Sequence, residues 1–384
     1  MGKSIKVEDY RHLARRRLPK MVFDYLDGGA EDEYGLRHNR DVFLDWHFKP
    51  SRLIDVSRRD LTVELFGQRY PLPFMIGPTG LNGIFRPKGD LLLAQAAARL
   101  GIPFVLSTAS NLTIEEVASN CDGELWFQLY VVRRDLANSL TDRALAAGYK
   151  TLVLTTDVTV NGYRERDMRS GFGLPLRYTP KVILDGLRHP AWSLDLMRTG
   201  VPQLANFRGA AAATPQAQAA LMSRQMDASF SWEDLARLRD RWPHRLLVKG
   251  ILRSEDAQKC VELGADGVIL SNHGGRQVDS CLSPMEVLSQ TARLVTKPIL
   301  IDSGFRRGGE IVKALALGAK IVLLGRATLY GLAARGEPGI DDVLSILRTE
   351  IDRTLALIGC NSVVQLSSDF LVPTFGRHNE EKRS

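Results

Sequence analysis

The sequence predicts an α/β protein, a (β/α)8 TIM barrel with an N-terminal helical cap and a long insertion after the fourth strand. Three observations support this fold class. Eight short apolar runs recur along the chain, each followed by turn residues. The runs are continuously apolar rather than alternating, as expected of strands that are covered on both faces. Helical patterns such as DLLLAQAAARLG lie between them, and eight alternating strand and helix units close a parallel barrel.

The expected strands share a run of aliphatic or β-branched residues bounded by Gly, Pro, Ser or Asp. A doubly wound sheet is the competing architecture, but it rarely has eight units, and no GxGxxG follows the first strand here. In chain order the strands are expected at PFMIG (73–77), PFVLS (103–107), LWFQLY (125–130), TLVLTTD (151–157), RLLVKG (245–250), GVILSN (267–272), PILIDSG (298–304) and KIVLLGR (320–326).

The regions outside the strands define the domain organisation. We expect one domain over residues 1–384, with residues 1–70 as the cap and the barrel over about 71–335. The gap from 158 to 244 is far longer than the others, which predicts an insertion over about 171–222. Within it, residues 171–209 combine five Lys or Arg with many apolar residues. This segment is either a lid or subunit-contact loop, or a basic, apolar patch that rests on a membrane surface.

Composition excludes several classes of protein. The chain is 44% hydrophobic and 25% charged, which is typical of a soluble domain with a buried core. The net charge of +7 is spread along the chain, without a basic run interleaved with aromatics and without zinc-ligand spacing, so we expect neither nucleic acid nor metal as a partner. The four cysteines form no CxxC pair, which favours a cytoplasmic location. The N-terminus lacks a signal peptide, and no apolar window reaches the roughly 18 residues of a membrane span.

Polar side chains follow the expected strands where barrel enzymes place their chemistry, at the carboxyl ends. Two of these ends, DSGFRRGGEI (302–311) and GRAT (325–328), combine glycines, arginines and helix N-termini. Either alone would be read as a turn with surface arginines, but on consecutive strands they indicate a phosphate site, and hence a phosphorylated cofactor or substrate. The other strand ends carry Gly80, Ser107, Gln128 with Tyr130, Thr155 with Asp157, Lys249, and His273 with Arg276.

The segment SNHGGRQ (271–277) places a base beside a guanidinium. An imidazole has an ordinary pKa near 6.5 and accepts a proton at neutral pH. Arg276, together with Arg164 from beyond the fourth strand, can hold a carboxylate through charge-assisted hydrogen bonds. Asp157, at the end of the fourth expected strand, is placed where it can accept the imidazole N–H of His273. These residues together suit an acid substrate that loses a proton.

Three further residues have alternative interpretations. Lys249 is expected inside the barrel, where its ammonium needs an electron-rich neighbour. It either stabilises negative charge on a redox ring or forms a Schiff base. Tyr130 and Tyr25 either donate hydrogen bonds to a substrate carboxylate or alkoxide, or pack in the core.

Nine motifs in this order resemble the FMN-dependent α-hydroxy acid oxidase and dehydrogenase family. The resemblance runs from about Val7 to Gly359 and is weakest over 171–222. The motifs are DYLDGGAEDE, GPTG, WFQLY, LVLTTD, GYRERD, LVKG, SNHGGRQ, DSGFRRG and LLGRA.

The resemblance implies a barrel that binds FMN, with His273 as the active-site base and Asp157 as its partner. It implies that Arg164, Arg276, Tyr25 and Tyr130 hold the carboxylate and hydroxyl of the substrate, while Lys249 faces the N1 and C2 carbonyl edge of the flavin. The remaining implied cofactor contacts are Pro78, Thr79, Gly80, Ser107, Gln128, Thr155, Ser271 and Asp302 around the ring system, and Gly304, Arg306, Gly325 and Arg326 at the phosphate.

One residue departs from the family pattern. Most members have alanine at the position of Gly80, and the missing methyl leaves room for a bulkier substituent at the substrate's α-carbon, unless the glycine only relaxes a turn. We therefore expect oxidation of an aryl-substituted (S)-2-hydroxy acid to the 2-oxo acid, by a hydride or a carbanion route that residue types do not distinguish. The resemblance further implies a homotetramer, transfer of electrons to a membrane quinone, and peripheral contact of the 171–209 segment with the cytoplasmic face of the inner membrane.

Other functions remain open on the sequence. Within the family, the chain could be an L-lactate dehydrogenase or an oxidase that uses oxygen. An FMN-barrel isomerase, such as type 2 isopentenyl diphosphate isomerase, also needs phosphate-binding glycines and a lysine, although it has no use for the two arginines of the carboxylate clamp. A barrel without catalytic activity has no use for a histidine, two arginines and a lysine at one end.

Overall fold

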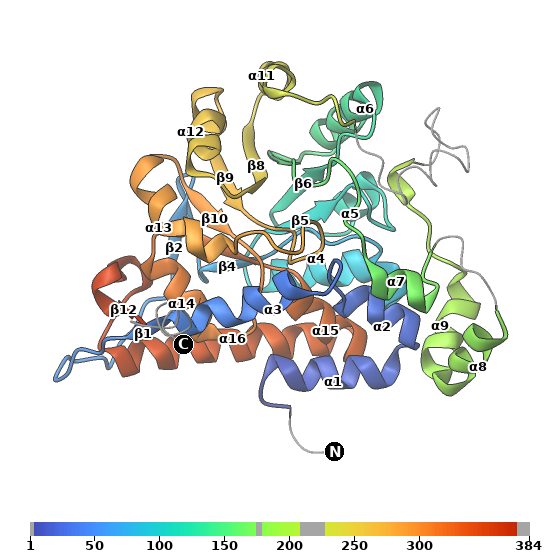
Figure 1. Ribbon diagram of the computed structural model, residues 1–384, viewed down its shortest axis with the longest axis horizontal. Helices are drawn as coiled ribbons and strands as arrows, with labels where there is room; N and C mark the ends of the chain where they lie inside the picture. Colours follow the sequence, from blue (N-terminus) through green and yellow to red (C-terminus); the bar gives the residue numbers. More distant parts are fainter. Residues whose placement is uncertain (1–3, 174–178, 208–226, 375–384) are drawn as a thin grey trace, which may run out of the picture.

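The computed structural model describes residues 4–173, 179–207 and 227–374, and a closed barrel of eight parallel strands forms its centre (Figure 1). Neighbouring strands in the barrel follow one another in the chain, and the last strand pairs with the first. This closure confirms the predicted (β/α)8 fold and excludes an open doubly wound sheet. The strands are β4 (Phe74–Ile76), β5 (Phe104–Ser107), β6 (Leu125–Leu129), β7 (Thr151–Thr155), β8 (Arg245–Ile251), β9 (Gly267–Leu270), β10 (Ile299–Ile301) and β11 (Ile321–Leu324).

Helices follow the strands and surround the barrel, as the sequence patterns predict. Several begin at a side-chain cap: before α5, Thr113 Oγ1 accepts the Glu116 N–H at 3.0 Å, and the Glu116 carboxylate accepts the Thr113 N–H at 2.7 Å. The surrounding helices are α4 (Gly89–Arg99), α5 (Ile114–Ser119), α6 (Arg134–Ala146), α11 (Trp232–Arg241), α12 (Ser254–Glu262), α13 (Pro284–Leu294), α14 (Gly308–Ala316), α15 (Arg326–Arg335) and α16 (Glu337–Ile358), with the 3-10 turns η2 (Asn82–Ile84), η4 (Val363–Gln365) and η5 (Ser368–Phe370).

The barrel interior changes from apolar to polar along its axis. Successive side chains of a strand point to opposite sides, so Val105 and Ser107 of β5, or Leu247 and Lys249 of β8, both face inward. The interior residues nearer the amino end of the barrel, such as Val105 and Leu247, form an apolar cluster. This cluster is separate from the core that the strands form with the surrounding helices. A hairpin of β2 (Val63–Leu65) and β3 (Gln68–Tyr70) packs on this cluster and covers the amino end of the barrel. The polar interior residues therefore gather at the carboxyl end.

The N-terminal cap is helical as predicted up to Asp45, through α1 (Val7–Arg17), α2 (Lys20–Asp27), α3 (Tyr34–Asp41) and the 3-10 turn η1 (Val42–Asp45). It then continues as β1 (Trp46–Phe48), which pairs with β12 (Leu371–Pro373) near the end of the described chain. Neither this pair nor the β2–β3 hairpin was predicted.

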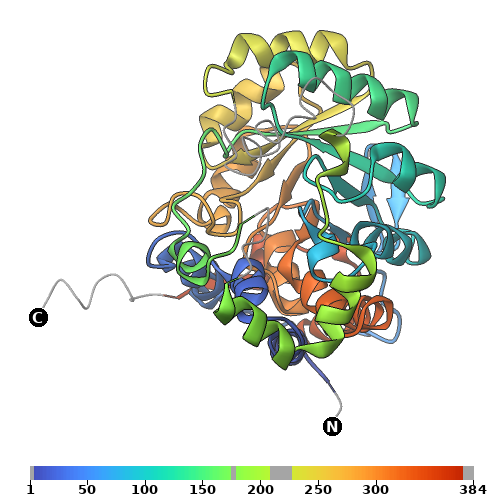
Figure 2. The same cartoon turned by 90° about the vertical axis from the view of Figure 1, so that its right-hand side faces the viewer.

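The insertion after β7 contributes α7 (Glu165–Ser170), α8 (Pro180–Arg188), α9 (Pro190–Thr199) and the 3-10 turn η3 (Ala205–Phe207). Helices α8 and α9 lie beside α1 and α2 at one edge of the molecule (Figures 1 and 2). Several contacts fix them there: the Trp192 indole N–H donates to the Ile84 carbonyl at 2.7 Å, the Lys20 N–H donates to Asp185 at 2.6 Å, and Arg17 of α1 pairs with Asp195 of α9. Residues 174–178 and 208–226, which include much of the predicted 171–222 insertion, lie outside the described residues. Within the described ranges, no helix combines the length and apolarity that a bilayer span requires.

Candidate active site

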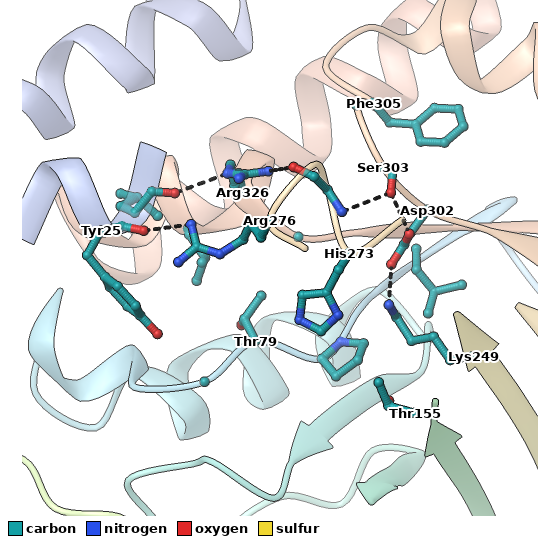
Figure 3. Close-up of a pocket in the computed structure, with 18 of the residues that line it drawn as sticks. Tyr25, Thr79, Thr155, Lys249, His273, Arg276, Asp302, Ser303, Phe305 and Arg326 are labelled. Carbon is teal, nitrogen blue, oxygen red and sulfur yellow. Dashed lines mark hydrogen bonds and ion pairs between the residues drawn. The ribbon is translucent and has the colours of Figure 1, made fainter. Parts of the chain in front are cut away.

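A cleft opens at the carboxyl end of the barrel, between the strand ends and the N-terminal cap. In Figure 3, Tyr25 and Arg276 lie to one side of His273, and Lys249 with Asp302 lies to the other. The predicted site residues that line this single cleft are Tyr25, Pro78, Thr79, Gly80, Tyr130, Thr155, Lys249, His273, Arg276, Asp302, Gly304, Arg306, Gly325 and Arg326.

Five predicted residues lie just outside the lining. Ser107 and Gln128 are buried behind it, where the Ser107 hydroxyl donates to Gln128 Oε1 at 2.9 Å. Asp157 and Ser271 contact His273 and Lys249 from behind. Arg164 lines an adjacent cavity, which shares Tyr25 with the cleft.

His273 and Asp157 form an acid–base pair across the ends of β9 and β7. The Nδ1 atom of His273 lies 2.9 Å from Oδ1 of Asp157, and its Nε2 atom lies 3.3 Å from the Tyr130 hydroxyl. Burial alone would raise the pKa of Asp157, but the positive charges of His273 and Lys249 outweigh it and hold that pKa below its ordinary value. Because the ionised carboxylate accepts the Nδ1 proton, Nε2 is the atom of His273 that can accept a proton from a substrate.

The backbone at His273 is left-handed, with φ of 57°, and Gly274 and Gly275 follow at 68° and 71°. A non-glycine residue in this conformation costs about 1–2 kcal/mol, so local contacts must compensate for it. The His273 N–H donates to the Ser271 hydroxyl at 3.0 Å, and the Gly274 N–H donates to the Ser303 hydroxyl at 3.1 Å. The glycines of the GG pair are thus required by the turn that presents the imidazole.

The two arginines of the predicted carboxylate clamp converge on Tyr25. The Arg276 guanidinium lies 5.0 Å and the Arg164 guanidinium 5.9 Å from the centre of the Tyr25 ring. Nη1 of Arg276 donates to the carbonyls of Tyr25 and Gly28, at 2.9 and 2.7 Å. These hydrogen bonds fix the guanidinium through Nη1. Asp167 lies between the two arginines, 3.5 Å from Arg164 and 3.9 Å from Arg276.

Lys249 is buried and charged. Its ammonium lies 3.0 Å from Asp302 and donates to the Ser271 hydroxyl at 2.7 Å. Burial opposes the charge, but the carboxylates of Asp302 and Asp157 outweigh burial and raise the pKa of Lys249 above its ordinary value. A lysine held as a cation is a poor nucleophile, so this geometry favours the stabilisation of negative charge over a Schiff base.

The polar atoms around the cleft fit the FMN that the sequence motifs imply. The hydroxyls of Thr79 and Thr155 and the Gln128 amide nitrogen are buried without a hydrogen-bond partner in the described protein. Buried polar groups are normally paired, so these three, on the ends of β4, β7 and β6, indicate a polar ring system in the cleft.

The expected phosphate end of the cleft holds concentrated positive charge. Three N–H groups of Arg326 donate to the carbonyls of Leu26, Gly28 and Gly274, at 2.7–3.1 Å, which leaves two of its five for a ligand. Burial and the nearby charges of Arg276 and Arg306 together lower the pKa of Arg326 to about 10, against the opposing influence of Tyr330 and Asp27. A phosphate bound here would relieve this repulsion.

Sequence reasoning missed two residues that build the site, Asp27 and Ser303. Asp27 is buried and accepts hydrogen bonds from Arg11 (2.6 and 2.8 Å), Tyr330 (2.8 Å) and Arg166 (3.0 Å), and so ties the cap and α7 to α15. The Ser303 hydroxyl accepts the Gly274 N–H in the turn that carries His273. Both lie inside quoted motifs, DYLDGG and DSGFRR, but nothing in the sequence identifies their partners.

The adjacent cavity offers apolar space next to the proposed clamp. Leu81, Met168, Phe172 and Leu204 line it together with Ala109. The Phe172 ring stacks on Tyr25 with ring centres 4.2 Å apart.

Gly80 packs against Ala109, which lines this adjacent cavity. A β-carbon at Gly80 would lie 2.9 Å from the Ala109 β-carbon, closer than such atoms normally approach. Gly80 is not one of the glycines with a positive φ. The glycine is therefore explained by close packing, not by relaxation of a left-handed turn.

The chain is similar to known proteins over nearly its whole length. A family model for FMN-dependent dehydrogenases matches residues 14–373. The (S)-mandelate dehydrogenase of Pseudomonas putida is 65% identical over 365 residues, which cover 95% of this chain and 93% of that protein. An L-lactate dehydrogenase of Vibrio cholerae serotype O1 is 40% identical over 371 residues, with 95% and 98% covered. A crystal structure of the monotopic membrane protein (S)-mandelate dehydrogenase superposes with a TM-score of 0.95 at 64% identity, over 97% of this chain and all of that one.

Proposed function

The chain belongs to the FMN-dependent dehydrogenase family, and from this premise we propose that its substrate is (S)-mandelate or a closely related aryl (S)-2-hydroxy acid. The product is the corresponding 2-oxo acid, phenylglyoxylate for mandelate. The enzyme is an FMN-dependent 2-hydroxy acid oxidoreductase, which removes the FMN-barrel isomerase and the idle barrel from consideration.

One observation carries the proposal: a histidine paired with a carboxylate, an arginine fixed beside a tyrosine, and a buried lysine cation all line or contact one cleft. A hydroxy acid needs each of these groups. Its carboxylate needs a cationic clamp, and its oxidation releases a proton that a base must accept.

Each side chain has a defined role in the proposed reaction. Bound FMN supplies a two-electron acceptor. Arg276 and Arg164 bind the substrate carboxylate, and the hydroxyls of Tyr25 and Tyr130 orient it. His273 accepts the proton at Nε2, and Asp157 stabilises the resulting imidazolium through Nδ1. Lys249 places a positive charge where negative charge develops during oxidation.

The aryl group of the substrate is proposed to occupy the adjacent cavity beside Tyr25. Leu81, Met168, Phe172 and Leu204 supply apolar contacts there. The close packing of Gly80 on Ala109 supports this assignment, because a larger residue at position 80 would push Ala109 into the cavity. The 65% identity to an (S)-mandelate dehydrogenase supports the same substrate.

The electrons are proposed to pass to a quinone at the membrane, and α8 and α9 are proposed to make the membrane contact. These helices expose Leu187 (72%) and Met197 (76%), together with Arg188 and Arg198. Apolar and basic side chains on one exposed edge suit an anionic bilayer surface. The similarity to a monotopic membrane protein supports this contact. We place the protein on the cytoplasmic face of the inner membrane, as a homotetramer.

The visible spectrum tests the substrate directly. Purified protein should be yellow, and anaerobic (S)-mandelate should bleach the flavin faster than L-lactate, while (R)-mandelate should leave it oxidised. Reoxidation by a water-soluble quinone should exceed reoxidation by air. Faster bleaching by lactate would replace the proposed substrate by that of the lactate dehydrogenase relatives, and rapid reoxidation by air would indicate an oxidase.

A further inference from the structure

The turn that carries His273 is held from a distant part of the chain. Asn272, which precedes the histidine, faces Asn39 of α3, and both side chains are almost fully buried, with exposed fractions of 3% and 1%. Their amides form a reciprocal pair: Asn39 Nδ2 donates to Asn272 Oδ1 at 2.8 Å, and Asn272 Nδ2 donates to Asn39 Oδ1 at 2.8 Å. The pair links the N-terminal cap to the end of β9.

Asn272 uses its whole amide in this arrangement. Its Oδ1 also accepts the Gly275 N–H at 3.1 Å, and its Nδ2 also donates to the Leu282 carbonyl at 3.2 Å. A primary amide has two donors and two acceptor positions, so all four are occupied. The amide therefore spans the turn, from the residue before His273 to the second glycine after it.

The backbone of α3 fits closely against the same turn. A β-carbon at Gly275 would lie 2.6 Å from the Leu36 nitrogen, and a β-carbon at Gly304 would lie 2.0 Å from the Asn39 carbonyl oxygen. Arg40, the next residue of α3, donates to the Gly304 carbonyl and pairs with Glu310 at 2.6 and 2.7 Å. Helix α3 thus contacts the loops after β9 and β10 at once and leaves no room for the turn to relax.

We propose that Asn39 is a positioning residue for the catalytic base, acting through Asn272 to hold the left-handed conformation of His273. This inference rests on the proposed role of His273. Three consecutive residues with positive φ, the first of them not glycine, are unusual for an L-amino-acid chain. Ser271 and Ser303 bond the N–H groups of His273 and Gly274. The Gly275 N–H is shared between the backbone carbonyl and the side-chain oxygen of Asn272, both at 3.1 Å, and the side-chain oxygen is the acceptor that Asn39 holds in place. If the turn opened, the imidazole would move relative to both Asp157 and the substrate.

The test replaces Asn39 by Leu, which is close to isosteric but neither donates nor accepts. Flavin reduction by (S)-mandelate is followed under anaerobic conditions across substrate concentrations, in holoenzyme whose FMN content is measured from its visible spectrum. A misplacement of the base on the ångström scale should lower the limiting rate of reduction by about 10- to 100-fold. The concentration at half-maximal rate and the dissociation constant of (R)-mandelate should stay within about twofold, because the carbonyls of Tyr25 and Gly28 hold the Arg276 guanidinium separately.

Two further variants separate positioning from general destabilisation. Asn39→Asp keeps an oxygen that can accept from Asn272 Nδ2, but it loses the donor and sets a carboxylate oxygen against Asn272 Oδ1, so its rate should also fall below that of wild type. Thr291→Val removes a buried hydroxyl that contacts Ser254 at 3.0 Å between α12 and α13, far from the turn. It should lower thermal stability without changing the rate of flavin reduction.

A wild-type limiting rate in either FMN-bound Asn39 variant would overturn the inference. So would an equal loss of rate in Thr291→Val, if that variant and the Asn39 variants lose the same amount of thermal stability. If Asn39→Leu does not fold, Asn39→Asp decides. Failure of the wild-type enzyme itself to reduce its flavin with (S)-mandelate would instead reject the proposed function, so the two failures are distinguishable.

Discussion

Nδ1 of His273 lies 2.9 Å from Oδ1 of Asp157, although 116 residues separate them in the chain. The contact joins the ends of β9 and β7, which are not neighbours in the barrel because β8 lies between them. Lys249, on that intervening strand, contributes to the low pKa of Asp157. The imidazole, its carboxylate partner and the buried cation are therefore one electrostatic unit across three consecutive strands.

Replacing His273 by Gln should leave FMN bound and lower the rate of flavin reduction by about 10²- to 10⁴-fold, the usual contribution of a positioned general base. Anaerobic mixing with (S)-mandelate measures this rate. His12, whose side chain is 59% exposed on α1, offers a control, since His12→Gln should behave as wild type. Normal flavin reduction in His273→Gln would remove the histidine from its proposed role.

Replacing Lys249 by Met should lower the midpoint potential of the bound flavin, because a buried positive charge favours the reduced, more negative cofactor. Each tenfold change in the two-electron equilibrium corresponds to about 30 mV, which a potentiometric titration resolves. Lys249→Arg retains the charge beside Asp302 and should keep the potential near that of wild type. A potential unchanged by the Met variant would argue against electrostatic stabilisation by Lys249.

Replacing Gly80 by Ala should reduce the preference for aryl substrates. The new methyl would lie 2.9 Å from the Ala109 β-carbon and 3.3 Å from its carbonyl oxygen, so the loop after β5 must shift into the adjacent cavity. The ratio of kcat/KM for mandelate to that for lactate should fall by about tenfold or more, the usual effect of one methyl group in an apolar pocket. Gly309→Ala on α14 is the matched control, because its methyl would make only ordinary van der Waals contacts, with Phe48 at 3.7 Å and Thr354 at 3.8 Å. An unchanged ratio would place the aryl group elsewhere.

Replacing Asp27 by Asn should destabilise the protein near neutral pH by less than the about 3–5 kcal/mol of a fully buried pair, because the side chains of Arg11 and Arg166, which would then face a neutral group, are 34% and 32% exposed. Burial opposes ionisation of Asp27, but hydrogen bonds and charge from Arg11 outweigh it and hold its pKa well below the ordinary 3.8. The folded state therefore gains stability from this group above its ordinary pKa and loses it as the pH falls through the lower folded value.

Denaturant titrations at several pH values check this prediction. The stability difference between wild type and Asp27→Asn should shrink as the pH falls below about 4. Asp352→Asn, which breaks a partly exposed pair with Arg59, should cost only about 0–1 kcal/mol. A difference that is constant with pH would mean that Asp27 acts by shape and not by charge.

Replacing both Leu187 and Met197 by Glu should release the protein from anionic lipid vesicles. Each substitution removes an exposed apolar side chain from the edge formed by α8 and α9 and adds repulsion, so binding should weaken by about tenfold or more. Sedimentation with phosphatidylglycerol vesicles measures the bound fraction. Leu357→Glu, at a position on α16 that is 71% exposed, controls for added charge and should bind as wild type. Equal binding by the double variant would assign the membrane contact to another surface.

The sequence alone determined the barrel and the rim on which its chemistry lies. Continuous apolar runs such as TLVLTTD and GVILSN predict strands because both faces of each strand are covered, and the inward alternation then brings Thr155, Lys249 and Ser271 to the carboxyl end. Local sequence carries these features, so reading the chain in order suffices to find them.

Only the tertiary structure decided which side chains meet. Asn39 with Asn272, Asp27 with Tyr330, and Gly80 with Ala109 are pairs in which neither member marks its partner in the sequence. Their contacts depend on where the cap helices and the strand-end loops pack, and packing is a property of the folded chain as a whole. The sequence determines which functional groups stand at each strand end. Three-dimensional packing determines the distances between these groups and the backbone conformation that presents them.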